Sequence, residues 1–272
     1  MLENIRYTNH LGETVYFNGA QNIFARHGEL RDYSWNYDVN NDIISGFNHR
    51  KISQKSLPIR VHGTSEQCQI ARNRLYEVID KDTIATQPGK LWFDDYYLRC
   101  FISASKKSRY MPNGGDMELT VITDNSYWVK PTTHKFGPQS ITFGLKYNKS
   151  YRYRYTDYAA NVKITNSNIA AMPFKLVIYG PCVNPEIYIG TQPYKINIEL
   201  QTSESVELTA IDQEKTIIKT DASGEKTNVF NFREKAYDNF APIPNGTFMV
   251  SWDGSFNFDL TVYDRRSEPI WN

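Results

Sequence analysis

Cysteine is scarce in this sequence. Its 272 residues include three cysteines, Cys68, Cys100 and Cys182, and no CxxC pair. An odd, widely spaced set argues against a disulfide framework and against a cysteine-based zinc site. Two of the three stand in apolar helix or strand contexts, so we expect buried, reduced thiols and synthesis in a reducing cytoplasm.

Long apolar runs and signs of export are also missing. No stretch approaches the roughly 20 apolar residues that a membrane-spanning helix needs. The N-terminus has neither the basic flank nor the apolar core of a signal peptide, so we expect no secretion by that route. The net charge is only +1. Without a global field, we expect no specific nucleic-acid binding, and without a long apolar run we expect no membrane insertion.

Motifs for catalysis or metal binding are lacking as well. The sequence has no GxSxG elbow, P-loop or GxGxxG. Adjacent strand residues point to opposite faces, so Asp94 and Asp95 predict a turn rather than the carboxylate pair of a glycosidase. None of the histidines pairs with another ligand at metal spacing; they are His10, His27, His49, His62 and His134. We therefore expect no enzyme, no metal and no cofactor, and favour binding or assembly.

Aromatic residues, in contrast, are abundant, at 14% with 19 Tyr and 14 Phe. Such richness with little helical periodicity predicts a mainly β protein. One helix is predicted over residues 65–82, where Thr64 and Gln67 form a capping-box pattern. Its apolar positions recur at helical spacing; they are Cys68, Ala71, Leu75, Val78 and Ile79.

An aromatic strand and a polar segment precede this helix. Residues 33–39 alternate strictly, with Trp35 and Tyr37 on one face. Residues 40–54 are polar, carry Arg50 and Lys51, and fit either a long loop or an extended hairpin arm. The aromatic strand and the arm are candidates for subunit contacts, the arm by adding a strand to a neighbour. An equally open interpretation buries Trp35 in its own core.

Short strands with regularly spaced turns fill the second half, which predicts a β-sandwich or a jelly roll. A domain boundary is expected near residues 130–140, giving an N-terminal domain 1–135 and a C-terminal domain 136–272. The predicted strands are 160–165, 174–181, 186–189, 194–200, 206–211, 216–220, 227–232, 248–252 and 256–263.

Two further segments carry suggestive side chains. Tyr151, Tyr153 and Tyr155 alternate with arginines. Their rings form either the core face of a sandwich strand or a surface for a sugar or a protein partner. The basic segment 103–110, with Lys106, Lys107 and Arg109, is interpreted as a solvated loop rather than a phosphate site.

The order of these features resembles one family. Gly28-Glu29-Leu30 precedes the aromatic strand, and the strand–helix unit ends in Gly89-Lys90-Leu91 before an aromatic hairpin. Near the end, Ile243-Pro244-Asn245-Gly246 leads into residues 248–252, and the closing strand runs through residues 262–269. With these motifs the chain resembles the distal tail proteins of siphophages, the siphovirus-type tail component family.

The resemblance implies a fold and a role. The fold would be an N-terminal β-barrel or sandwich-like domain with one α-helix, followed by a galectin-like β-sandwich. The N-terminal domain would form a hexameric ring at the tip of a long non-contractile tail, and DNA would pass through it. The ring would join the tail tube protein to the tail-associated hub protein of the baseplate and often carries receptor-binding proteins for host attachment. The protein would be a virion component assembled in the host cytoplasm.

Two other functions stay open at this point. One is a carbohydrate-binding module that recognises a host cell-wall polysaccharide through its second domain. The other is a glycoside hydrolase, which the missing acid pair disfavours.

Overall fold

The chain is mainly β and divides into two compact units. The computed structural model describes residues 4–26, 28–49, 52–138, 160–166, 168, 170–211 and 214–270. The first unit comprises Met1–Lys130 with Arg265–Asn272, and the second comprises Pro131–Asp264. The chain passes between them within β10 (Trp128–Phe136) and β21 (Asn257–Arg266). A boundary of independent domains at residue 135 stays a prediction.

Seven antiparallel strands form the sheet of the first unit, in the order β2-β1-β7-β8-β9-β6-β3. Its two ends meet, because Phe17 N donates to Ile5 O (2.8 Å) and Ala25 N donates to Phe17 O (2.7 Å). The sheet is therefore barrel-like. The strands are β1 (Ile5–Thr8), β2 (Thr14–Tyr16), β3 (Ile23–Ala25), β6 (Ser53–His62), β7 (Gly89–Phe93), β8 (Tyr96–Met111) and β9 (Gly114–Thr123).

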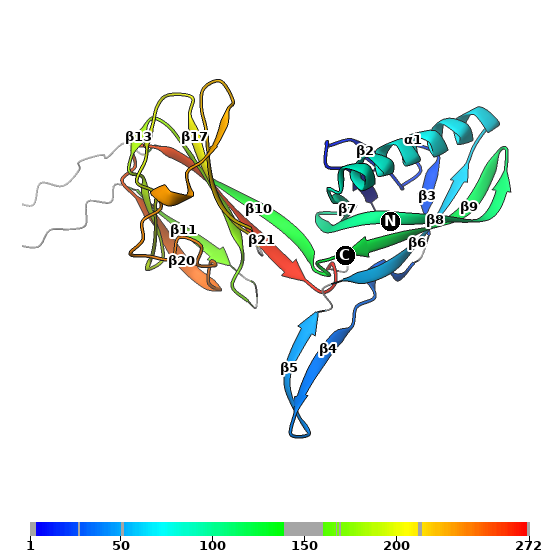
Figure 1. Cartoon of the computed structure of the whole chain (residues 1–272), viewed down its shortest axis with the longest axis horizontal. Coiled ribbons are helices and arrows are strands. Elements are labelled where there is room, and N and C mark those ends of the chain that lie inside the picture. Colours follow the sequence, from blue (N-terminus) through cyan, green and yellow to red (C-terminus); the bar gives the residue numbers. More distant parts are fainter. Residues whose placement is uncertain are drawn as a thin grey trace, which may run out of the picture. The chain divides into compact units, whose positions relative to one another are not determined.

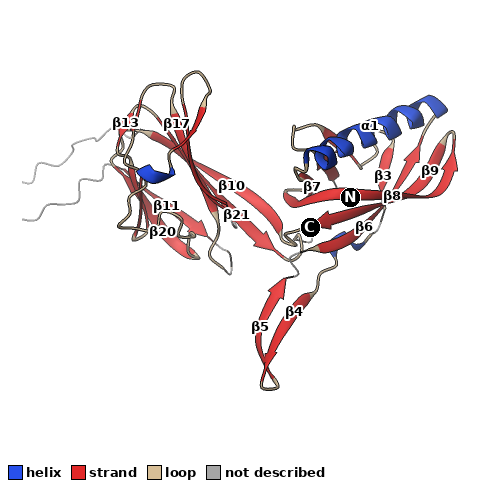
Figure 2. Cartoon of the chain, viewed as in Figure 1, coloured by secondary structure: helices blue, strands red, loops and turns tan. Residues whose placement is uncertain are grey.

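Helix α1 (Ser65–Ala85) lies along this sheet (Figures 1 and 2). The residues of its apolar stripe belong to the same core cluster as the buried residues of the sheet. Both halves of the predicted capping box are present: Gln67 N donates to Thr64 Oγ1 (3.2 Å), and Thr64 N donates to Gln67 Oε1 (2.9 Å). The helix ends at Thr86, whose φ of 53° is left-handed. Among the described residues it is the one α-helix, and no helix there is long and apolar enough to cross a membrane. The mainly β fold with one helix is thus confirmed.

The cap gives a first testable prediction. Thr64→Ala removes the hydroxyl that accepts from Gln67 N, so one amide of the first turn loses its partner. We expect the free energy of unfolding in urea to fall by about 1 kcal/mol. Thr64→Ser keeps the acceptor and is the control. An alanine variant as stable as the serine variant would contradict the role of this cap.

The basic segment 103–110 is a strand rather than the predicted loop. It lies in β8, whose far half pairs with β9 as a long hairpin through Met111 and Gly114. Both faces of this half are mostly exposed, so polar residues follow one another without alternation. Residues 128–136, expected near a domain boundary, likewise form the continuous strand β10.

The second unit is a β-sandwich. One sheet has the order β19-β18-β17-β12-β21, and the other has the order β11-β20-β14-β15; β13 and β16 pair separately. The strands are β11 (Ala160–Asn166), β12 (Phe174–Tyr179), β13 (Cys182–Val183), β14 (Glu186–Ile189), β15 (Gln192–Lys195), β16 (Glu199–Leu200), β17 (Ser205–Ile211), β18 (Glu214–Thr220), β19 (Lys226–Asn228) and β20 (Gly246–Trp252).

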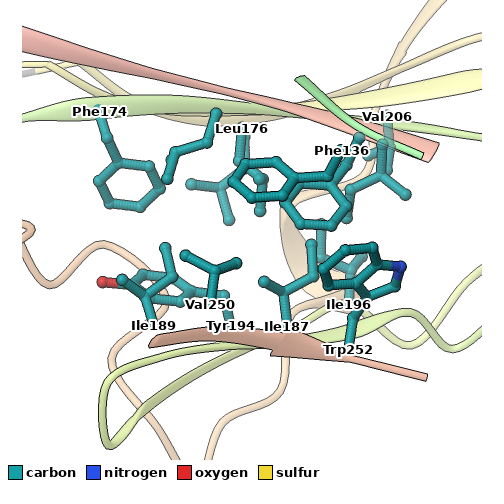
Figure 3. Close-up of a cluster of buried hydrophobic side chains, with 14 of the residues drawn as sticks. Phe136, Phe174, Leu176, Ile187, Ile189, Tyr194, Ile196, Val206, Val250 and Trp252 are labelled. Carbon is teal, nitrogen blue, oxygen red and sulfur yellow. The ribbon is translucent and has the colours of Figure 1, made fainter. Parts of the chain in front are cut away.

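The core of the sandwich lies between its two sheets. In Figure 3, Phe174 and Leu176 face Ile187, Val250 and other residues of the opposite layer. Aromatic rings dominate one end, where Phe136 stacks on Phe258 (4.5 Å between centroids) and Trp252 meets Phe258 edge to face (5.1 Å). Such pairs add stability beyond the area they bury. The sandwich predicted for the second half is thereby confirmed.

Candidate functional site

The most unusual surface of the described chain is a hairpin in the first unit. Strands β4 (Trp35–Asn40) and β5 (Ile43–His49) pair only with each other, as a separate two-stranded sheet. Figure 1 shows that this hairpin projects from the sheet of its unit. We call residues 35–49 the arm. An isolated two-stranded hairpin is marginally stable in water, so the arm needs further contacts to be stable.

A two-residue turn closes the tip of the arm. Asn41 and Asp42 have φ values of 51° and 64°, both in the left-handed region. Two such residues in a row characterise a type I′ turn, which favours Asn and Asp and matches the twist of the strands. The sequence therefore encodes a hairpin here, and the structure decides between the predicted loop and the predicted arm in favour of the arm.

One face of the arm is apolar along its whole length. Tyr37 pairs with Phe47, and Val39 pairs with Ile44. The register shifts between Asp38 and Val39, which leaves Ser45 as an extra residue in β5. This bulge keeps Ile44 and Phe47 on the same face, although two residues, Ser45 and Gly46, separate them. The face comprises Trp35, Tyr37, Val39, Ile44 and Phe47.

This apolar face is open to solvent. The exposed fractions are 42% for Trp35, 61% for Tyr37, 56% for Val39, 53% for Ile44 and 62% for Phe47. None of the five belongs to a core cluster of the chain. Contiguous apolar surface of this kind marks an interaction site, because burying it against a partner is favourable.

The root of the arm is fastened to the sheet by Lys55 of β6. Its side chain is 7% exposed, and its Nζ donates to the carbonyl oxygen of Asp32 and lies 3.5 Å from that of Glu29. Burial lowers the pKa of this amine, against the nearby charges of Asp32 and Glu29. Ser126 Oγ donates to Ser53 Oγ (2.9 Å) where the chain re-enters the sheet. These bonds hold the segments on both sides of the arm.

The structure describes two of the four predicted interface residues. Trp35 and Tyr37 lie together on the apolar face. The interpretation that buried Trp35 in its own core is wrong, because its side chain is 42% exposed. Arg50 and Lys51 lie outside the described residues. So do the candidate sugar or partner residues Tyr151, Tyr153 and Tyr155, whose role stays a prediction.

The second strand of the arm supplies Ile44 and Phe47, which complete the apolar face. The interpretation of residues 40–54 as a polar loop or hairpin arm does not place these two side chains on that face. The available signal was Asn41-Asp42, a turn pair between two runs rich in aromatic and β-branched residues. Within the described ranges, no cluster of three or more His, Cys, Asp or Glu side chains is placed to hold a metal ion.

Comparison with known proteins relates this fold to phage tail structures. No protein-family model matches the sequence, and no curated protein matches it either. The solved structure of the Dit protein of phage SPP1, described as a paradigm of hub adsorption apparatus in phages infecting Gram-positive hosts, matches with a TM-score of 0.58 and 10% identity. That match covers 98% of this chain and 100% of the other.

A chain of the baseplate of phage P2, in its activated conformation with calcium, matches with a TM-score of 0.61 and 11% identity. It covers 99% of this chain and 100% of the other. A chain of the same baseplate with strontium matches with a TM-score of 0.63 and 10% identity. That match covers 99% of this chain and 100% of the other. At such identities the likeness concerns the fold, and it extends over nearly the whole of this chain and all of the others. The protein therefore has the fold of siphophage distal tail proteins, as these hub and baseplate chains display it.

Proposed function

We propose that this protein is a structural component of the tip of a long non-contractile phage tail, where its copies form a hexameric ring. The observation that carries the proposal is the exposed apolar face of the arm. A ring of identical subunits needs two different, complementary surfaces on each copy. A projecting hairpin with one apolar face suits one of these surfaces, because it can add to a neighbour without rearranging its own unit.

The likeness in fold supports this role. It extends over 98% or more of this chain and all of each compared chain. The compared structures are of a hub adsorption apparatus protein and of a baseplate. By extension, we assign the ring to the junction between the tail tube protein and the tail-associated hub protein, with receptor-binding proteins at its periphery and DNA passing through it.

Assembly rather than catalysis is the activity in this proposal. The protein would belong to the virion and would be built into the tail in the host cytoplasm. The alternative, recognition of a cell-wall polysaccharide, rests on Tyr151, Tyr153 and Tyr155, which lie outside the described residues. No observation on the described surface favours it over assembly.

Light scattering during size-exclusion chromatography tests the proposal. The wild-type protein is expected to give an assembly of about six times the mass of one chain. Replacing Tyr37 and Phe47 together by serine removes the centre of the apolar face and should weaken assembly at least about 30-fold, because central aromatic residues dominate interfaces. The circular dichroism spectrum should not change, since neither side chain is in the core.

A matched control removes exposed apolar side chains elsewhere. Leu11 in the β1–β2 turn and Val183 of β13 are 63% and 67% exposed. Replacing both by serine should leave assembly unchanged. The proposal fails if the wild-type protein is a monomer at every concentration, or if the arm variant and the control variant assemble equally well.

A further inference from the structure

We propose that the arm of one copy docks into a basic hollow on the first unit of the next copy. The hollow has a volume of about 360 Å³ and lies where β3, β6, β8 and β9 meet. We call it the basic hollow. The inference rests on the proposed ring assembly and specifies the second surface that such a ring requires. Its lining includes Phe24, Arg60, Arg109, Met111 and Asp116.

The arm has a distinct charge as well as an apolar face. Residues 33–49 include two acidic residues, Asp38 and Asp42, and no lysine or arginine. Asp42 stands at the exposed tip of the turn and forms no ion pair with any residue that the structure describes. A surface that receives the arm should therefore combine apolar contacts with positive charge.

The basic hollow has this combination. Arg60 makes a bidentate contact with Asp116, from Nε to Oδ1 (2.7 Å) and from Nη2 to Oδ2 (3.0 Å). Arg26 Nη2 lies 3.6 Å from Oδ1 of the same carboxylate. The hydrogen bond from Arg60 and the charges of Arg26 and Arg109 lower the pKa of Asp116. Arg60 and Arg26 thus contact this carboxylate, and Arg109 acts on it only through its charge, so positive charge is left over.

Arg109 is the cation best placed for a partner. It is exposed in the far half of β8 and makes no ion pair with a carboxylate in the described part of the chain. Beside it, Phe24 and Met111 are each 37% exposed and offer apolar contact. The hollow thus pairs an available guanidinium with an apolar wall, as the tip of the arm pairs a carboxylate with aromatic and branched side chains.

A second hollow, at the root of the arm, is not expected to receive the arm of another copy because of its charge. That hollow lies at the arm's own root and is lined by Glu29 and Asp32. Its one lysine, Lys55, is buried with its amine bound to backbone carbonyls. An acidic arm would be repelled there.

The arm does not lie on its own unit, because its apolar face is exposed. A second copy therefore supplies the contact. Since the arm and the basic hollow are different surfaces of one unit, the contact is heterologous and can close into a ring.

Engineered disulfides test this contact directly. The native cysteines Cys68, Cys100 and Cys182 are buried, so added thiols should react selectively. Asp42→Cys and Arg109→Cys variants are made separately, mixed and mildly oxidised. We expect cross-linked heterodimers of the two variants. The control pairs Asp42→Cys with Gln69→Cys, on the exposed face of α1, and should give at least about tenfold less product.

Charge exchange provides a second readout. Arg109→Glu should weaken assembly about tenfold, and adding Asp42→Arg to the same chain should restore most of it. If Tyr37→Ser with Phe47→Ser dissociates the ring while neither the cysteine pair nor Arg109→Glu has an effect, the basic hollow is not the acceptor and the proposed function stands. If the arm variant has no effect either, the proposed function fails first. The inference would also be overturned if Asp42→Cys formed disulfides with the Gln69→Cys variant instead of the Arg109→Cys variant.

Discussion

Replacing Leu75 by aspartate is expected to unfold the first unit. Leu75 is fully buried in the middle of α1, where the helix packs on the sheet. Losing a buried leucine side chain costs about 2–5 kcal/mol by itself. An unpaired carboxylate in the same place adds several kcal/mol more. The total is similar to the whole stability of a typical domain.

Circular dichroism and urea unfolding would measure this effect. Ile70→Asp is the matched control, because Ile70 lies on the same helix with its side chain 61% exposed. That variant should stay within about 0.5 kcal/mol of the wild-type protein. A Leu75→Asp protein with native circular dichroism and an unchanged urea midpoint would show that the helix does not pack as described.

The helix could be predicted from the sequence because its signals are local. The capping pair Thr64 and Gln67 and the stripe containing Leu75 act within a few turns of one segment. The structure confirms them and extends the helix from the predicted residue 82 to Ala85. In the second unit the alternation of buried and exposed residues is equally local, and strands such as β12 and β21 were predicted for that reason.

Segments without a buried face were harder to predict. The far half of β8 has both faces mostly exposed, so its lysines and arginine gave no alternating pattern and suggested a loop. In the arm, the bulge at Ser45 interrupts the alternation that would have joined Ile44 and Phe47 to Tyr37. Periodicity identifies a face, but it does not say whether the chain itself or a partner covers that face. The alternating pattern around Trp35 is therefore compatible with both a core position and an interface position, and only its exposed fraction of 42% distinguishes them.

The buried carboxylate of Asp82 was not predicted from the sequence. Asp82 follows Val78 and Ile79 on the apolar stripe of α1 and is 1% exposed. It accepts a hydrogen bond from Tyr7 OH at Oδ2 (2.5 Å) and from His10 N at Oδ1 (2.8 Å), and His10 Nδ1 lies 2.5 Å from Oδ1. Burial, followed by the bond to Asp82, raises the pKa of Tyr7, so its hydroxyl stays protonated and donates. An acidic residue on an apolar stripe was the signal.

Asp82→Ala should therefore be the most damaging polar-to-alanine substitution in the first unit. It leaves the hydroxyl of Tyr7, which is fully buried, and the amide of His10 without their acceptor. Breaking a buried charged contact by removing one partner costs about 3–5 kcal/mol. Urea unfolding should show this loss. The control is Asp80→Ala, on the exposed side of the same helix, which should change stability by less than about 0.5 kcal/mol.

A double-mutant cycle separates this contact from general damage to the helix. Tyr7→Phe alone removes one donor and leaves both contacts of Asp82 with His10 in place, so it should cost about 1–2 kcal/mol. In the Asp82→Ala background the same substitution should cost much less, because the hydroxyl has already lost its acceptor. The coupling energy should reach about 1 kcal/mol or more. Strictly additive effects would mean that Asp82 stabilises the unit without the hydrogen bond from Tyr7, and that the β1 strand and helix α1 are joined by packing alone.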